Sequence, residues 1–448
     1  MTRLALWFSL VLVVAAASAW LADNPGAVSI EFQSYAIDTS FAALALLLAL
    51  IALISASAVS LYGWLRRDMP IFGSNQVIKR QSRGFKLLNQ SLVALSSGDA
   101  ARARSLIEQA EVLLPPQPMV HLIAAEAATR AGDHTAASKR YAALEDTDDG
   151  RLLGLRGLLV EARRTGQESE ALRLARVAFD ENRKSPWVLK TLFALEVAAG
   201  NWREAEAALE KVAREKLLEP EVIARHKGAL AYAEATELKL KGEKVEARKS
   251  LKKAITARPD FMPAVVSLSR LELSEGNKSA ASKVISDAWA KEPHPSLATA
   301  FKEIDTAEST ADWLKRVRKL IKSTDSHPQS KLILVDALMD AGEYEVARPV
   351  LDSLLKDAPS RAAWQFKLAL AHVLKEDPDP IETALKHASD GAKWRCTSCG
   401  HEPKGWSPLC PSCQSFDTLL WSSKESIITP NKAFEADNTI ALLADTAT

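Results

Sequence analysis

The four cysteines of this 448-residue chain lie within 18 residues of one another, at Cys396, Cys399, Cys410 and Cys413. They form two C-x2-C pairs with ten residues between the pairs. Each pair places two thiolates at one tight turn, and four thiolates complete a closed tetrahedral site for Zn²⁺. Gly400 suits the turn that follows the first pair, because glycine accepts a left-handed backbone. The pattern predicts a zinc ribbon over residues 391–421, folded largely by its metal.

Other chemistry is compatible with the same cysteines. Iron in a rubredoxin-like site uses the same four ligands. The Cys410-Pro411 dipeptide resembles a haem-responsive motif, although a proline in a zinc knuckle explains it equally, and His401 offers a substitute ligand. Two disulfides or a redox-active C-x-x-C are disfavoured, since no thioredoxin-like βαβ pattern lies nearby. Zinc is therefore the favoured metal, with iron as the alternative and a haem- or redox-sensing module as a further hypothesis.

Catalytic patterns are absent from the sequence. It contains no nucleophile elbow, no phosphate-binding loop and no dinucleotide fingerprint. The eight histidines are scattered, and a closed four-cysteine site leaves no position open for a substrate. A net charge of +1, with only Lys393, Arg395 and Lys404 near the cysteines, argues against nucleic-acid binding. We expect a protein that is not an enzyme and has no evident small-molecule substrate.

A glycine followed five residues later by an alanine recurs through the middle of the chain, mostly at a spacing of 34 residues. This period is the length of a tetratricopeptide repeat, an antiparallel pair of helices. Glycine ends the first helix in a left-handed turn, and Asp99, Asp133, Asn201 and Asn277 are placed to cap the second. The pairs are Gly98/Ala103, Gly132/Ala137, Gly166/Ala171, Gly200/Ala205, Gly242/Ala247, Gly276/Ala281 and Gly342/Ala347.

The repeats predict an α-solenoid superhelix over residues 69–390, with eight or nine helix pairs. Prolines at 115, 259, 293 and 359 are expected to stop second helices. A degenerate copy is expected near Glu308, another between Ala362 and Ala388, and a longer helix or loop near Pro220. Such arrays bind partner proteins in a concave groove. Most of the tryptophans are expected to pack within the array.

Two uncharged segments, Leu4 to Ala22 and Ser40 to Leu65, precede the array. Each is long enough to cross a bilayer, which predicts a transmembrane helical hairpin over residues 1–68. The loop at 23–39 alternates apolar and polar residues, as a small β-hairpin does. Ala17-Ser18-Ala19 leaves open the alternative that segment one is a cleaved signal peptide. The tail at 422–448 is polar and is expected to be disordered.

Basic residues follow the second segment, whereas the loop at 23–39 has none. The positive-inside rule therefore places everything after residue 66 in the cytoplasm. The basic residues are Arg66, Arg67, Lys79, Arg80, Arg83 and Lys86.

The chain resembles the HemY family of bacterial inner-membrane proteins, and the likeness covers most of its length. The residues that carry the likeness are Asn24-Pro-Gly-Ala-Val-Ser-Ile, Tyr35-Ala-Ile-Asp-Thr-Ser and the run from Gly84 to Asp99. The resemblance implies a multi-pass inner-membrane protein associated with haem and porphyrin metabolism. It does not imply a protoporphyrinogen oxidase, because the flavin fingerprint is missing.

The cysteine ribbon departs from the HemY pattern and is similar to the rubredoxin-like tail of LapB. That resemblance implies a membrane adaptor that regulates lipopolysaccharide synthesis by bringing an enzyme to its protease, with the ribbon packed against the repeats. The expected function is therefore a membrane-anchored cytoplasmic scaffold linked to haem synthesis or its control. The alternative is a LapB-like regulator of envelope lipid synthesis.

Overall fold

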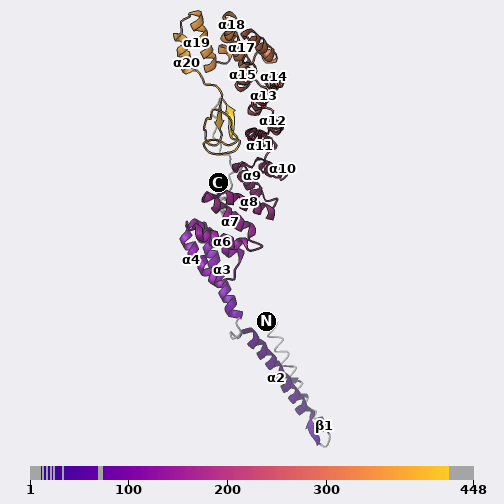
Figure 1. Ribbon diagram of the computed structural model, residues 1–448. Coiled ribbons are helices and arrows are strands. Elements are labelled where there is room, and N and C mark those ends of the chain that lie inside the picture. The colour runs from indigo at the N-terminus through magenta and orange to yellow at the C-terminus, as the bar shows by residue number, and fades with distance from the viewer. Residues whose placement is uncertain are drawn as a thin grey trace. The chain divides into compact units, whose positions relative to one another are not determined.

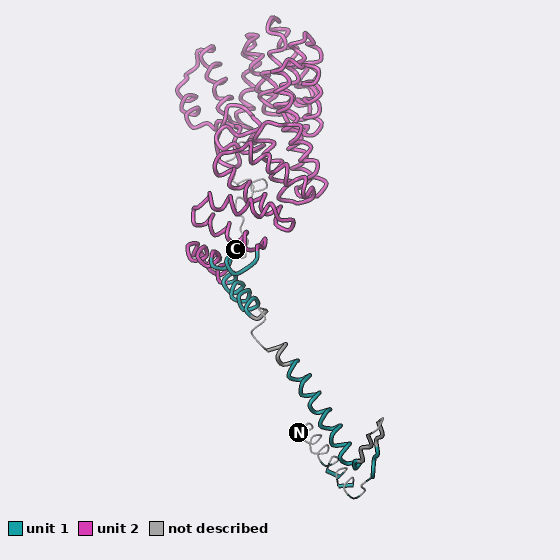
Figure 2. Tube along the Cα trace, turned by 60° about the horizontal axis from the view of Figure 1, so that its bottom comes forward, with its two compact units in different colours: residues 1–89, 109–115 teal, residues 90–108, 116–448 magenta. Residues whose placement is uncertain are grey.

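The computed structural model describes residues 26–32, 35–68 and 74–422, with six isolated positions before residue 26. The chain divides into two compact units (Figure 2). Unit 1 comprises residues 1–89 and 109–115, and unit 2 comprises residues 90–108 and 116–448. The first predicted apolar segment, from Leu4 to Ala22, and the predicted tail beyond Ser422 lie almost wholly outside the described residues.

Unit 1 contains a β-hairpin followed by a long apolar helix. Strands β1 (Ala27–Phe32) and β2 (Tyr35–Ser40) pair antiparallel, with Ala27 opposite Ser40. This confirms the hairpin predicted in the loop. Helix α2 (Phe41–Asp68) begins directly after β2. Its stretch Phe41–Gly63 has a mean hydropathy of 2.6, and it is the one described helix long and apolar enough to cross a membrane. At 1.5 Å per residue it measures about 35 Å, against a hydrocarbon layer of about 30 Å.

Eighteen helices in the described chain form nine antiparallel pairs, at the upper end of the expected range (Figure 1). The early pairs are α3 (Ser74–Ser96) with α4 (Ala100–Leu113), α5 (Pro118–Arg130) with α6 (His134–Glu145), α7 (Arg151–Arg164) with α8 (Glu168–Glu181), and α9 (Pro186–Ala198) with α10 (Trp202–Arg214). The later pairs are α11 (Pro220–Leu240) with α12 (Lys244–Ala257), α13 (Met262–Ser274) with α14 (Lys278–Trp289), α15 (Pro295–Glu303) with α16 (Thr310–Leu320), α17 (Pro328–Asp340) with α18 (Tyr344–Asp357), and α19 (Arg361–Leu374) with α20 (Asp379–His387).

The glycine and alanine positions do what their spacing predicted. All seven glycines adopt positive φ at the end of a first helix, between +72° and +83°. All seven alanines are fully buried. Because protein interiors are close-packed, a larger side chain at these positions would push the two helices of a pair apart. The four prolines follow the ends of α4, α12, α14 and α18, also as expected.

The irregular parts of the period have simple structural causes. The 42-residue step is taken up by α11, which is 21 residues long. The degenerate copy near Glu308 is the short pair α15 and α16, with 9 and 11 residues. Trp289 and Trp313 are buried in the core around this pair, as packing residues.

The capping prediction is correct for the aspartates and wrong for the asparagines. Asp99 and Asp133 accept hydrogen bonds from backbone amides of the following helix. Asn201 and Asn277 make no such bond. Each donates instead to a glutamate of the preceding helix, Glu196 or Glu272. Glu196 also accepts from Arg176, and Glu272 also accepts from Arg248. Each asparagine therefore hydrogen-bonds to a carboxylate and does not cap the following helix.

Candidate metal centre and its seat on the array

Two short strands hold the cysteine module together. Strand β3 (Lys393–Cys396) pairs antiparallel with β4 (Leu419–Ser422), so the module begins and ends side by side. A further bridge joins Leu409 to Phe416. Together they close the chain into a loop that carries both C-x2-C turns.

The two C-x2-C turns have the same backbone geometry. The carbonyl oxygen of Cys396 accepts from the amide of Gly400, and that of Cys410 accepts from the amide of Gln414, both at 2.9 Å. The residue after each pair is left-handed, Gly400 at φ +75° and Gln414 at φ +57°. The sequence indicated this conformation only for Gly400, since glycine is its usual occupant. The two turns are therefore equivalent knuckles, although only one contains glycine.

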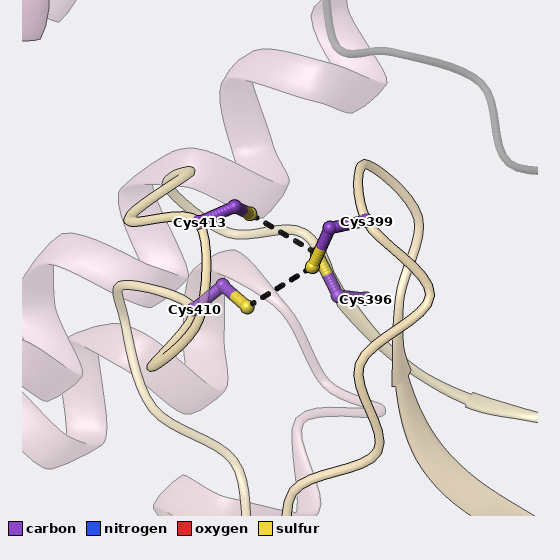
Figure 3. Close-up of side chains that lie close together, drawn as sticks. All are labelled: Cys396, Cys399, Cys410 and Cys413. Atoms are coloured by element: carbon purple, nitrogen blue, oxygen red, sulfur yellow. Dashed lines mark hydrogen bonds between the residues drawn. The ribbon is translucent and has the colours of Figure 1, made fainter.

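The four sulfur atoms converge on one point (Figure 3). All four lie within 4.8 Å of one another, and none is in a disulfide. The Sγ atoms of Cys396 and Cys413 are 3.7 Å apart, as are those of Cys399 and Cys410. Four thiolates at about 2.3 Å from a central zinc ion would be about 3.8 Å apart. The donor set and its spacing fit a tetrahedral metal ion, but they do not distinguish zinc from iron.

The surroundings of Cys396 favour the ionised, thiolate form of its side chain. Burial opposes ionisation of Cys396, but hydrogen bonds from the Thr418 hydroxyl and from the backbone amides of Ser398 and Cys399 outweigh it. They lower the pKa of Cys396 to about 6. Burial instead raises the pKa of Cys410 to about 12. Cys410 would therefore need a cation beside it to lose its proton at neutral pH.

The ribbon rests on the first helices of the central pairs, as the resemblance to LapB implied. Trp406 packs edge-on against Phe261 and Tyr232, with ring centroids 4.6 and 5.2 Å away. Cys396 and Cys410 belong to the same buried apolar cluster as Ala229 and Leu268 of α11 and α13. Two of the four cysteines are thus buried against the core of the array, whereas Cys399 and Cys413 are exposed.

One buried carboxylate links the ribbon to the array. Asp417 is fully buried and accepts from His226 at 2.8 Å and from Arg225 at 3.0 Å, both on α11. Arg258, the residue that follows α12, lies 3.5 Å from the other carboxylate oxygen of Asp417. Phe416 packs beside this group on Phe193 and His226. None of these residues was singled out from the sequence, where Arg225 and His226 stand beside Lys227 in an ordinary polar run of α11.

A cavity of about 550 Å³ opens between the ribbon and α9. Phe193, Leu195 and Ala198 line it from the array, and Leu409, Gln414 and Phe416 line it from the ribbon. Its walls mix apolar and polar groups, and the polar ones include Ser398, Ser415, Arg163 and Glu168. A partly apolar groove with a few charged groups suits a peptide segment of a partner protein.

Comparisons with known proteins agree with this architecture. Residues 26–132 match the family model described as the HemY protein N-terminus, and residues 334–379 match a tetratricopeptide-repeat model. The chain is 24% identical over 426 residues to the probable magnetosome protein Mms48 of Magnetospirillum gryphiswaldense, covering 92% of this chain and 93% of that protein.

Solved structures of low similarity include Naa15/Naa10 bound to HypK-THB, at 14% identity, with coverage of 75% of this chain and 57% of that chain and a TM-score of 0.37. The MamA protein matches at 18% identity, over 39% of this chain and 91% of that chain, with a TM-score of 0.26. The two family-model matches confirm the HemY resemblance for the N-terminal part and the tetratricopeptide class of the repeats.

Proposed function

We propose that this protein is a scaffold held at the cytoplasmic face of a bacterial inner membrane, where its helical array binds partner proteins. One observation carries the proposal: nine stacked helix pairs follow a 28-residue apolar helix in the same chain. Tetratricopeptide arrays are interaction surfaces, and no catalytic constellation was found in the sequence. The array would hold its partners close to the bilayer that anchors it.

The proposed topology has two spans, with β1 and β2 outside and the array inside. The basic residues after α2 support this orientation by the positive-inside rule. Protease treatment of inverted membrane vesicles would test it, because the array should be digested while the hairpin stays protected. Mass measurement of the remaining fragment would show whether the first segment is retained. Protection of the array from protease in inverted vesicles would mean that the array lies on the opposite side of the membrane from the one proposed.

The cavity beside α9 is the part of the array that we assign to partner binding. Ala198→Trp places an indole in this cavity, whereas Ala199→Trp adds the same side chain at an exposed position outside its lining. Partners crosslinked in native membranes should be lost from the first variant and kept by the second. Equal recovery of partners from both variants would place their binding elsewhere on the array.

The proposed pathway is haem or porphyrin synthesis, supported by the HemY match at residues 26–132. A second candidate is regulation of lipopolysaccharide synthesis, favoured by the four-cysteine ribbon seated on the array. Depletion of the protein, followed by measurement of porphyrins and lipopolysaccharide, separates the two. Porphyrin accumulation with normal lipopolysaccharide supports the first, and the reverse supports the second.

The ribbon's proposed role is structural, with Cys396, Cys399, Cys410 and Cys413 as ligands of one zinc ion. The seat on α11 and α13 supports a role in shaping the groove. Metal analysis of the purified protein would distinguish zinc from iron. A change in the visible spectrum on adding haem would instead support the haem-sensing alternative.

A further inference from the structure

We propose that the first turns of α3 bind the anionic phospholipid headgroups of the membrane that holds α2, an inference that rests on the proposed membrane anchoring. The thirty residues between Asp68 and Asp99 contain four basic residues and no acidic one. Among the described residues, no acidic side chain pairs with Lys79, Arg83 or Lys86. Such a run of positive charge attracts an anionic surface.

Packing against α4 fixes which side of α3 is free. Gly84 lies so close to α4 that a Cβ there would be 2.7 Å from the Cγ of Leu114. Leu88 is buried one turn further along, and Arg80 donates to the carbonyl of Val112 one turn earlier. Residues 80, 84 and 88 therefore form the face turned towards α4. Away from this face, Ile78, Lys79, Arg83, Phe85 and Lys86 are exposed.

Those exposed faces combine apolar and basic groups. Ile78 and Phe85, seven residues apart on one side of the helix, are 61% and 45% exposed. Lys79, Arg83 and Lys86 occupy the adjoining side, at spacings of four and three residues, and are also exposed. An amphipathic helix of this kind places apolar side chains at the acyl boundary and basic side chains among the phosphates.

The length of the connection supports the membrane as the ligand. Five residues separate the end of α2 from the start of α3. Six Cα steps of 3.8 Å or less reach about 20 Å. If α2 crosses the bilayer, the first turn of α3 cannot leave the neighbourhood of the headgroups, so their effective concentration is high. The short connection to α2 therefore keeps the exposed side chains of the first turns of α3 near phospholipid headgroups.

The test uses the full-length protein in lipid nanodiscs, with a photoreactive benzoylphenylalanine in place of Ile78. Discs of phosphatidylcholine are compared with discs that also contain phosphatidylglycerol. We expect cross-linking to lipid in the anionic discs and little in the neutral ones. Each basic residue at an anionic surface strengthens binding by about fivefold. The triple charge reversal K79E, R83E and K86E should therefore lower the cross-link to the neutral level.

Two controls separate charge from folding. The variant K79R, R83K, K86R keeps the charge and should cross-link as the parent does. The variant K283E, K315E, K319E reverses three exposed lysines on α14 and α16, and it should also cross-link normally. Equal cross-linking of the parent protein in neutral and anionic discs would overturn the proposal. So would parent-level cross-linking of the variant K79E, R83E, K86E in anionic discs. Failure of the parent protein to enter discs would instead refute the membrane anchoring, and transfer of the cross-link to added nucleic acid would identify a different ligand.

Discussion

The Oδ2 atom of Asp417 lies 2.8 Å from Nδ1 of His226, across 191 residues of sequence, and both side chains are buried. The imidazole donates to the carboxylate, and Arg225 donates to the same oxygen. This contact fixes the last part of the ribbon on α11, just beyond the second cysteine knuckle. A carboxylate outside the four-cysteine cluster therefore helps to hold that cluster on the array.

Asp417→Asn should release the ribbon from the array without removing its metal. Loss of one partner from a buried charged pair costs about 3–5 kcal/mol. Limited proteolysis should cut the ribbon faster in this variant, while metal content stays at the parent level. Asp180→Asn is the matched control, since Asp180 forms an exposed pair with Arg183 and such pairs contribute at most about 1 kcal/mol. Parallel behaviour of the two variants would refute the seating role of Asp417.

Cys396→Ser or Cys413→Ser should unfold the ribbon and leave the membrane anchor intact. Three thiolates hold a metal ion poorly, and the small module depends on it for folding. The measurements are metal content, membrane fractionation and, after cobalt substitution, the visible bands of a tetrahedral thiolate site. Retention of one equivalent of metal by either variant would contradict the assignment of four cysteine ligands.

Gly400→Ala should weaken the first knuckle, whereas Gln414→Ala should leave the second intact. Both positions are left-handed, but only Gly400 lacks a Cβ. A Cβ in this conformation costs about 1–2 kcal/mol, a cost that Gln414 already carries. Competition for zinc with a chromophoric chelator should show weaker binding for G400A alone. Equal affinities would mean that the knuckle relaxes to accept the side chain.

Mild acid should loosen the contact at His294, which caps α15 and packs 4.6 Å from the ring of Trp421. Burial lowers its pKa from 6.5 to about 4. As the pH falls, the unfolded chain takes up this proton first, so stability is lost between about pH 6.5 and pH 4. His294→Asn keeps a capping acceptor and removes the titration. Denaturant unfolding across this range should be less pH-dependent in H294N than in the parent.

His327→Asn provides the comparison for that experiment. His327 caps α17 in the same way, through Nδ1 and the amide of Gln329. Burial also lowers the pKa of His327, but this side chain is only partly buried. H327N should therefore remove a smaller part of the pH dependence. A larger effect in H327N than in H294N would contradict the role assigned to His294.

Features that are local along the chain could be predicted from the amino-acid sequence. The glycine of each repeat has to adopt positive φ and the alanine five residues later has to fit under a crossing helix, so spacing alone located the helix pairs. Two C-x2-C turns likewise bring four sulfurs together within one short segment. The uncharged segment from Ser40 to Leu65 likewise indicated a helix long enough to cross a membrane.

The place of the ribbon on the array, and the polar residues that hold it there, follow from contacts between distant parts of the chain. The contact between Asp417 and His226 joins two distant segments, and neither residue type nor spacing encodes that distance. The asparagines at 201 and 277 show the same limit, because a glutamate one turn back, already paired with an arginine from the preceding pair, outcompetes the expected cap. Local conformation follows from neighbouring residues, whereas partners far apart in sequence are set by how the repeats stack.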